Sequence, residues 1–231
     1  MRYCYVKKIN RAQISTVSPK LLSVFLVLAG VTLIASATVP IFVYQFFVSP
    51  KFSTMIKPVP EETVLGEQGQ EEVDYTQVSS WFPEAPKLPP LPSKITHYGL
   101  SIPKLKIADV IVQIGGEDLK QSLIQYEGTA FPGQFGNTVI FGHSVLPQFF
   151  NPKNYLTIFS TLPTLKVGDE ILVDFDGVRY KYVVEQMIEV KPEDISILEQ
   201  RYDDLYLTLI TCVPPGTYLR RLAVRARLVK I

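Results

Sequence analysis

Hydrophobic positions follow two different patterns along the chain. Residues 21–50 contain no charged residue, and this run is longer than the about 20 apolar residues that a helix needs to cross a bilayer. From about residue 93 to the end, short apolar runs with strand-like alternation are separated by turn residues. Residues 49–92 are rich in proline and acidic residues, with little periodicity, so they predict a linker.

The first pattern predicts one transmembrane helix over 21–48, preceded by a basic cytoplasmic tail over 1–20. The tail holds five basic residues and no acidic one. The positive charge places the N-terminus in the cytoplasm and the remainder of the chain outside the cell membrane. Tyr44, Phe46 and Phe47 would form an aromatic belt at the outer interface.

A cleaved signal peptide is the competing interpretation of this run, because Ala35–Ala37 resembles a small-residue cleavage site. The apolar run continues past Ala37 to Val48, which favours a retained single-pass anchor over cleavage. In both cases the C-terminal part is exported.

The second pattern predicts an all-β domain with short helices over 93–231. Asp176-Gly177 between two alternating runs is a strong hairpin signal. Short helices are expected at 117–126 and 192–199. Seven or eight strands in one segment of this size favour a closed or nearly closed β-barrel. The strand-like runs are "GLSIP", "ADVIVQI", "NTVIFGH", "EILVDFD", "YKYVVEQMIEV", "LYLTLITC" and "RRLAVRARLV".

The charge of the chain argues against one class of partner. Its formal net charge is +1, and nucleic-acid-binding proteins usually carry a strong basic excess. No nucleic-acid partner is therefore expected.

The two cysteines fall in different compartments of the predicted topology. Cys4 lies in the cytoplasmic tail and Cys212 in the exported domain, so the two cannot form a disulfide. Exported thiols are usually oxidised to disulfides. Cys212 is therefore either a small buried apolar residue or a reactive thiol.

Cys212 ends one strand-like run and His143 ends another. A neighbouring imidazole can raise the thiolate fraction of a cysteine and pass a proton to a leaving amine. Arg221 is the first residue of its strand face after the loop that leaves Cys212, and a guanidinium can stabilise an oxyanion. Cysteine, histidine and arginine in one cleft would form a transacylation site.

These motifs resemble the sortase family, the membrane-anchored cysteine transpeptidases of bacterial surfaces. The resemblance rests on "TLITC" at Thr208–Cys212 and on "PGQFGNTVIFGH" at Pro132–His143. It is supported by "RRLAVRA" at Arg220–Ala226 and "LSIPKLKI" at Leu100–Ile107. It implies an eight-stranded sortase-type β-barrel behind the transmembrane helix.

The resemblance implies a role for each residue of the site. Cys212 would be the nucleophile, His143 the general acid and base, and Arg221 the group that binds the oxyanion or positions the substrate. Arg220 is the rival of Arg221, and Thr211 is expected to line the substrate groove.

The implied partners are a sorting-signal peptide of exported surface proteins or pilins and an amine on the cell wall or on a pilin. A Leu-Pro-x-Thr-Gly-like signal would be cleaved through a thioester and its acyl group transferred to the amine. Two alternatives stay open. One is a thiol protease that only hydrolyses the signal, and the other is a non-catalytic, membrane-tethered peptide-binding module.

The chain departs from the family pattern at Ser144 and around Trp81. Ser144 follows His143, where several branches carry arginine or asparagine. No cofactor is required; calcium is the exception considered, since Glu117-Asp118 and Glu193-Asp194 are available acidic pairs without compelling ligand spacing. Trp81-Phe82-Pro83 could form a lid over the groove, and so could the pairs Leu88-Pro89 and Leu91-Pro92. The aspartate-proline-aromatic order of lid-bearing relatives is absent, however, which favours a plain linker.

Overall fold

The computed structural model describes residues 19–54, 74–86 and 88–229 and divides the chain into two compact units, 1–38 and 39–231. Cys4 lies outside the described residues. The N-terminal helix α1 spans Pro19–Val43 and is followed by a π-helical turn, Tyr44–Val48, and a 3₁₀ turn, Ser49–Lys51.

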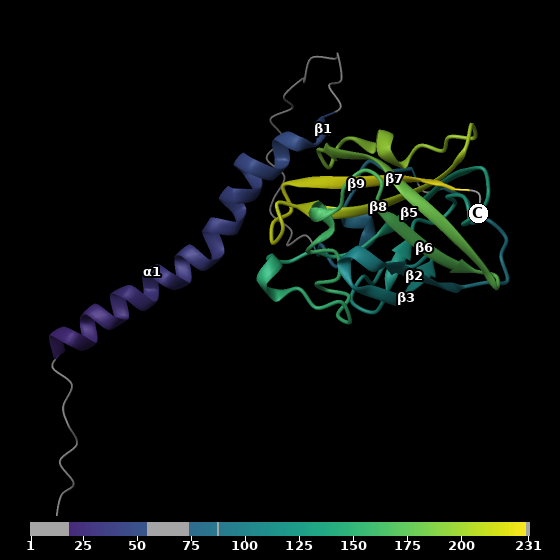
Figure 1. Ribbon diagram of the computed structural model, residues 1–231. Helices are drawn as coiled ribbons and strands as arrows, with labels where there is room; N and C mark the ends of the chain where they lie inside the picture. The colour runs from purple at the N-terminus through teal and green to yellow at the C-terminus, as the bar shows by residue number, and fades with distance from the viewer. Residues whose placement is uncertain (1–18, 55–73, 87, 230–231) are drawn as a thin grey trace, which may run out of the picture. The chain divides into compact units, whose positions relative to one another are not determined.

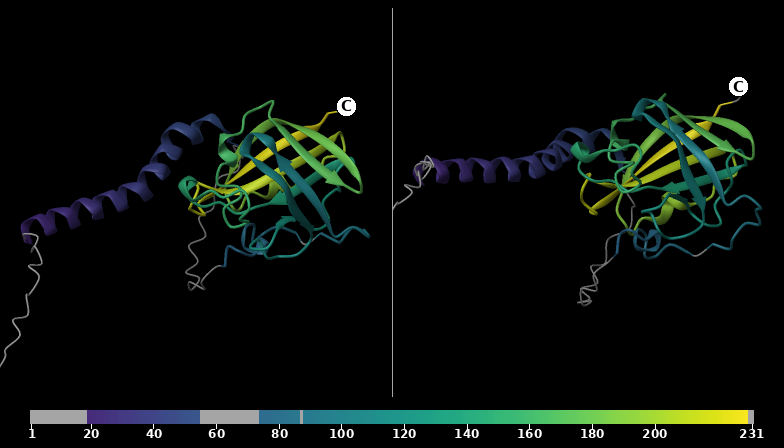
Figure 2. Two further views of the ribbon diagram at one scale, coloured as in Figure 1. Left: turned by 60° about the horizontal axis from the view of Figure 1, so that its bottom comes forward. Right: turned by 90° about the horizontal axis from the view of Figure 1, so that it is seen from below.

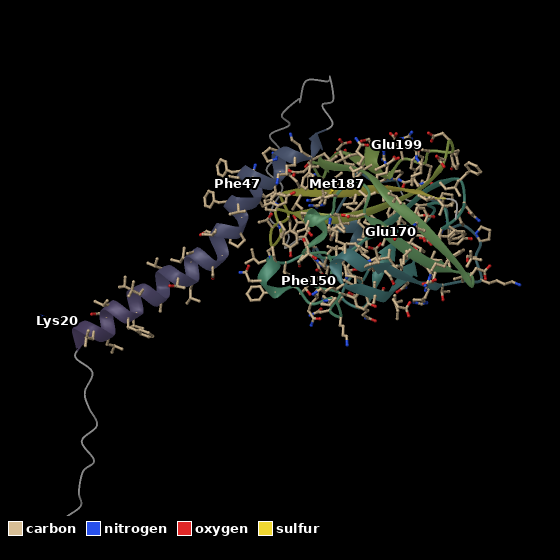
Figure 3. The ribbon with its side chains drawn as sticks, in the orientation of Figure 1. Lys20, Phe47, Phe150, Glu170, Met187 and Glu199 are labelled. Atoms are coloured by element: carbon tan, nitrogen blue, oxygen red, sulfur yellow. The ribbon has the colours of Figure 1, made fainter. Side chains whose placement is uncertain are left out.

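The segment Lys20–Lys51 is long and apolar enough to cross a membrane, at 32 residues with a mean hydropathy of 2.3. The side chains drawn between Lys20 and Phe47 in Figure 3 are mostly carbon. A helix that is apolar on all sides suits a lipid environment. Its hydroxyls bond back to helix carbonyls, as from Thr32 Oγ1 to the Leu28 carbonyl (2.8 Å), which suits the same environment.

Eight strands, β2 to β9, wrap into a closed barrel (Figures 1 and 2). The neighbours follow the order β7-β6-β2-β3-β4-β5-β8-β9, and β9 closes the barrel by pairing with β7. A two-residue strand β1, Ser53–Thr54, pairs in parallel with β7. The strands are β2 His97–Ile102, β3 Ile107–Ile114, β4 Leu123–Gln125, β5 Gly136–Phe141, β6 Glu170–Phe175, β7 Val178–Val190, β8 Leu205–Val213 and β9 Arg220–Leu228.

Alternation along β8 and β9 divides their side chains between two apolar clusters. Leu207, Leu209 and Val224 belong to the large cluster that fills the barrel. Ile210 and Ala223 belong to a second cluster on the outer face, where other segments of the chain cover the sheet. This outer face carries the candidate site.

The eight-stranded barrel confirms the predicted fold class. The hairpin is also confirmed, since Asp176 and Gly177 join β6 to β7 with φ values of 52° and 74°. Each of the seven predicted runs contains a strand.

The helix expected over 117–126 is wrong, because this segment contains β4 instead. All three residues of β4 are buried between β3 and β5. A short apolar run buried on both sides has no periodicity that separates a strand from a helix. The helix expected over 192–199 is reduced to one 3₁₀ turn, Ile195–Leu198, which begins after the capping residue Asp194.

Candidate active site

The three residues of the predicted site lie at one end of adjacent strands. Cys212 of β8 and Arg221 of β9 are register partners in an antiparallel pair. β5 runs parallel to β8, and the pairing of Phe141 with Ile210 brings the chain after β5 to the end of β8. His143 therefore follows its strand at the same end of the sheet as Cys212.

All three side chains are buried, with exposed fractions of 0% for Cys212, 4% for His143 and 1% for Arg221. Burial raises the pKa of the Cys212 thiol to about 12, although the charge of Arg221 acts in the opposite direction. Burial also lowers the pKa of His143. In this conformation the thiol and the imidazole are therefore both neutral near pH 7.

Residues 74–86, here called the lid segment, cover the site. Trp81 is completely buried, and its ring packs edge-on against His143 and Phe141, with centroid separations of 5.7 and 5.6 Å. Val78 and Phe82 join the same outer-face cluster as Cys212. The lid segment thus supplies the apolar cover that buries the three residues.

The lid segment also makes polar contacts with the site. The carbonyl oxygen of Trp81 accepts hydrogen bonds from Nε (3.3 Å) and Nη2 (3.1 Å) of Arg221. Nη1 of Arg221 donates to the carbonyl of Tyr218 (2.9 Å), and the Tyr218 ring stacks on Tyr75 at 4.0 Å. The backbone of Tyr75 raises the pKa of His143 and so opposes the effect of burial, and Nε2 of His143 has no partner among the described residues.

This arrangement differs from the plain linker expected over 49–92. The composition of that segment is dominated by proline and acidic residues, and the average conceals a local apolar triplet. Val78, Trp81 and Phe82 have the i, i+3, i+4 spacing of one apolar face, and a 3₁₀ turn over Val78–Ser80 presents them to the sheet. That spacing was the signal available in the sequence.

The guanidinium groups of Arg220 and Arg221 have different partners. The guanidinium of Arg220 is paired with the buried carboxylate of Glu189 at 2.9 Å. Every hydrogen bond of the Arg221 guanidinium among the described residues goes to a peptide carbonyl. Of the two, only Arg221 is opposite Cys212 in the strand register.

The side chain of Thr211, the residue predicted to line the groove, lies on the face of β8 opposite Cys212. Strand alternation places it there, and its register partner Leu222 belongs to the barrel interior. Its hydroxyl is fully buried and donates to the carbonyl of Gly142 (2.8 Å).

Three of the four acidic residues considered for calcium, Glu117, Asp118 and Asp194, accept hydrogen bonds from backbone nitrogens. Glu117 accepts a hydrogen bond from the Ser79 backbone, and Asp118 from the Lys120 backbone. Within the described part of the chain, no group of three or more His, Cys, Asp or Glu residues is arranged to hold a metal ion.

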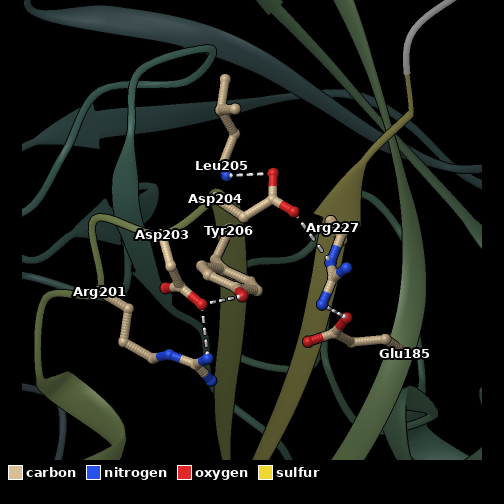
Figure 4. Close-up of polar contacts among 7 residues, drawn as sticks. All are labelled: Glu185, Arg201, Asp203, Asp204, Leu205, Tyr206 and Arg227. Carbon is tan, nitrogen blue, oxygen red and sulfur yellow. Dashed lines mark hydrogen bonds and ion pairs between the residues drawn. The ribbon is translucent and has the colours of Figure 1, made fainter.

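The far end of the same outer face carries a charged network instead of a covered site (Figure 4). Arg227 lies between Glu185 (2.9 Å) and Asp204 (3.4 Å). Arg201 pairs with Asp203 at 2.8 Å and stacks over the ring of Tyr206, the register partner of Arg227.

Comparisons with known proteins agree with this geometry. A family model described as a sortase domain matches residues 100–229. None of the curated proteins that were compared matches the chain.

Several solved structures are similar to the chain. A sortase D5 transpeptidase of Clostridium perfringens shares 26% identity with a TM-score of 0.50, covering 58% of this chain and 79% of that one. Sortase C-1 of Actinomyces oris shares 28% identity with a TM-score of 0.53, covering 60% and 77%. Sortase A of Corynebacterium diphtheriae shares 31% identity with a TM-score of 0.52, covering 60% and 63%.

Proposed function

Because the chain belongs to the sortase family, whose members are cysteine transpeptidases, we propose that it cleaves a sorting signal of exported proteins and transfers the acyl part to an amine. The signal would resemble Leu-Pro-x-Thr-Gly, and the amine would come from a cell-wall peptide or a pilin lysine. Cys212 would be the nucleophile, His143 the general acid and base, and Arg221 the group that holds the reacting carbonyl.

One observation carries this proposal. Arg221 lies opposite Cys212 and binds a peptide carbonyl, that of Trp81, through two of its nitrogen atoms. A guanidinium without a carboxylate partner is free to bind the carbonyl of a substrate and the oxyanion that develops from it. The Trp81 carbonyl therefore stands where a substrate carbonyl would bind.

The chemistry follows from these three groups. The thiol of Cys212 gives its proton to His143, and its Sγ adds to the carbonyl between the fourth and fifth residues of the signal while Arg221 stabilises the oxyanion. His143 gives its proton to the departing amine, which leaves a thioester on Cys212. The incoming amine then attacks the thioester, His143 accepts the proton from that amine, and the Cys212 thiolate leaves. The thioester retains acyl-transfer energy, so ligation requires no ATP.

The lid segment would set the resting state of this enzyme. Its contacts keep the thiol of Cys212 neutral and occupy Arg221, so substrate binding requires residues 74–86 to move away. Movement would readmit water, lower the pKa of Cys212 and leave Nε2 of His143 free to exchange a proton.

We propose that the N-terminal part of the chain attaches the barrel to the membrane. The tail 1–20 would lie in the cytoplasm, the retained anchor 21–48 in the membrane and the barrel 93–231 outside the cell. The apolar helix and the basic residues before it support this orientation.

The test uses the full-length protein in detergent, a library of Leu-Pro-x-x-Gly peptides, and either triglycine or a lysine peptide as acceptor. Mass spectrometry follows the products and the mass of the peptide containing Cys212. We expect an amine-ligated product and a transient acyl adduct, both absent in Cys212→Ala.

Two results would contradict the proposal. A thioester that only hydrolyses would favour a thiol protease. Binding of peptides without any adduct, both in the native chain and in Trp81→Ala, would favour the peptide-binding module.

A further inference from the structure

The backbone ladder between β5 and β8 ends before the two residues whose side chains would react. Regular pairing runs from Gly136 with Leu205 to Phe141 with Ile210. One more backbone hydrogen bond follows, from the Gly142 nitrogen to the Ile210 carbonyl (3.1 Å). Strand pairing alone therefore does not fix His143 relative to Cys212.

Two buried hydroxyls continue the connection where the ladder stops. Thr211 Oγ1 donates to the carbonyl of Gly142, the residue before His143 (2.8 Å). Ser144 Oγ, on the residue after His143, donates to the carbonyl of Cys212 (2.7 Å). The Ser144 bond is the one of the two that reaches the backbone of Cys212 itself.

The segment that carries Ser144 is also held from its other side. The carbonyl of His143 accepts a hydrogen bond from the Phe159 nitrogen (2.9 Å), and the Val145 nitrogen donates to Ser160 Oγ (2.9 Å). Ser144 is 4% exposed, so water does not compete for its hydroxyl. The Ser144 hydroxyl thus links a fixed segment to the end of β8.

We infer that Ser144 is a positioning residue for the transpeptidation, which holds the backbone of Cys212 at the distance and angle that His143 requires. Ser144 does not contact the substrate in this role; it acts through Cys212. The inference rests on the proposed function, because it assumes that Cys212 and His143 react together. A displacement of about 1 Å between reacting groups is enough to slow a reaction about 100-fold.

Ser144→Ala, Ser144→Thr and the control Ser122→Ala provide the test. Ser122 has the same 4% exposure, and its hydroxyl bonds to the side chain of Gln113 instead of the site. Each variant is made in the full-length chain, with and without Trp81→Ala, so that lid movement does not limit the rate. The readouts are kcat, KM, the melting temperature and the pH dependence of Cys212 alkylation.

For Ser144→Ala we expect kcat to fall about 10-fold to 100-fold, with KM within about twofold. The alkylation profile should move to higher pH because the imidazole no longer supports the thiolate. Ser144→Thr keeps the hydroxyl and should recover most of kcat. Ser122→Ala removes a hydroxyl of equal exposure away from the site and should leave both kcat and the alkylation profile unchanged.

Three results would overturn the inference. They are an unchanged kcat in Ser144→Ala, an equal loss in Ser144→Thr, and an equal loss in Ser122→Ala. If kcat is unchanged in Ser144→Ala while Cys212→Ala is inactive, the positioning role fails and the proposed function stands. If Cys212→Ala is active, the proposed function fails first.

Discussion

The two arginines at opposite ends of the outer face of β9 have different surroundings. Arg221 and Arg227 both belong to the outer face of β9. Arg227 is about half exposed and paired with Glu185 and Asp204 (Figure 4). Arg221 is buried, and its guanidinium contacts only peptide carbonyls and aromatic rings among the described residues.

The guanidinium of Arg227 is held in ion pairs of the fold, whereas that of Arg221 has no carboxylate partner among the described residues. Exposed ion pairs such as those of Arg227 contribute about 0–1 kcal/mol each. A buried guanidinium without a carboxylate is costly unless its donors are satisfied. The lid carbonyl satisfies Arg221 at present, and a substrate carbonyl would do so once the lid segment moves.

Loss of the thiol should have the largest effect at the Arg221 end. Cys212→Ala removes the only group in the described site that can form a thioester, so both ligation and hydrolysis should become undetectable. Product formation by mass spectrometry is the measurement. Appreciable turnover in Cys212→Ala would rule out the mechanism.

Arg221→Ala and Arg227→Ala test the comparison directly. Arg221→Ala should reduce kcat/KM about 10²-fold to 10³-fold, the scale of losing an oxyanion donor. Arg227→Ala should leave kcat/KM near the native value and destabilise the fold by about 1 kcal/mol or less. Steady-state kinetics and thermal unfolding measure the two effects.

Arg220→Ala, at the adjacent residue, is the control for Arg221→Ala. It breaks the ion pair with the buried Glu189 and should affect stability more than catalysis. A greater loss of kcat/KM in Arg220→Ala than in Arg221→Ala would contradict the assignment of Arg221.

The sequence predicted the barrel well because strand alternation and the Asp176-Gly177 turn are local signals. It also proposed Cys212, His143 and Arg221 as candidate site residues, and the strand register brings these three to one end of the sheet. The partner of the Thr211 hydroxyl, the carbonyl of Gly142, depends on how β5 and β8 end side by side, which the sequence does not state.

The lid segment and β4 were less predictable for another reason. Both depend on contacts with other segments of the chain. β4 is defined by its pairing with β3 and β5. Trp81 is buried because it packs on the outer face of the sheet. The proline-rich composition around it predicts a linker instead.

Removal of the Trp81 side chain should have the next largest effect. Trp81→Ala exposes Cys212 and relieves the burial that raises its pKa to about 12. Alkylation of Cys212 at pH 7.5 should become at least about tenfold faster, since the thiolate is the reacting species. Phe135→Ala, at an exposed aromatic side chain, is the control and should leave the rate unchanged. An equal rate in Trp81→Ala and the native chain would show that the lid segment does not limit access.

A pH-dependent lid equilibrium is the smallest expected effect. Burial lowers the pKa of His143 under the lid; Asp74 and the Tyr75 backbone oppose this shift, and Lys120 reinforces it. Opening of the lid would return the pKa toward its ordinary value of 6.5. Proton uptake therefore favours the open state, and the closed state should weaken as pH falls from 7.5 to 5.5.

Fluorescence can follow this equilibrium, because the sequence has one tryptophan, Trp81 itself. Its emission should shift to longer wavelength in acid as the indole becomes hydrated. Asp74 titrates below this window, since a hydrogen bond from the Thr76 hydroxyl lowers its pKa, so the shift should disappear in His143→Gln. A shift that persists in His143→Gln would assign the pH response to another group and leave the lid closed by packing alone.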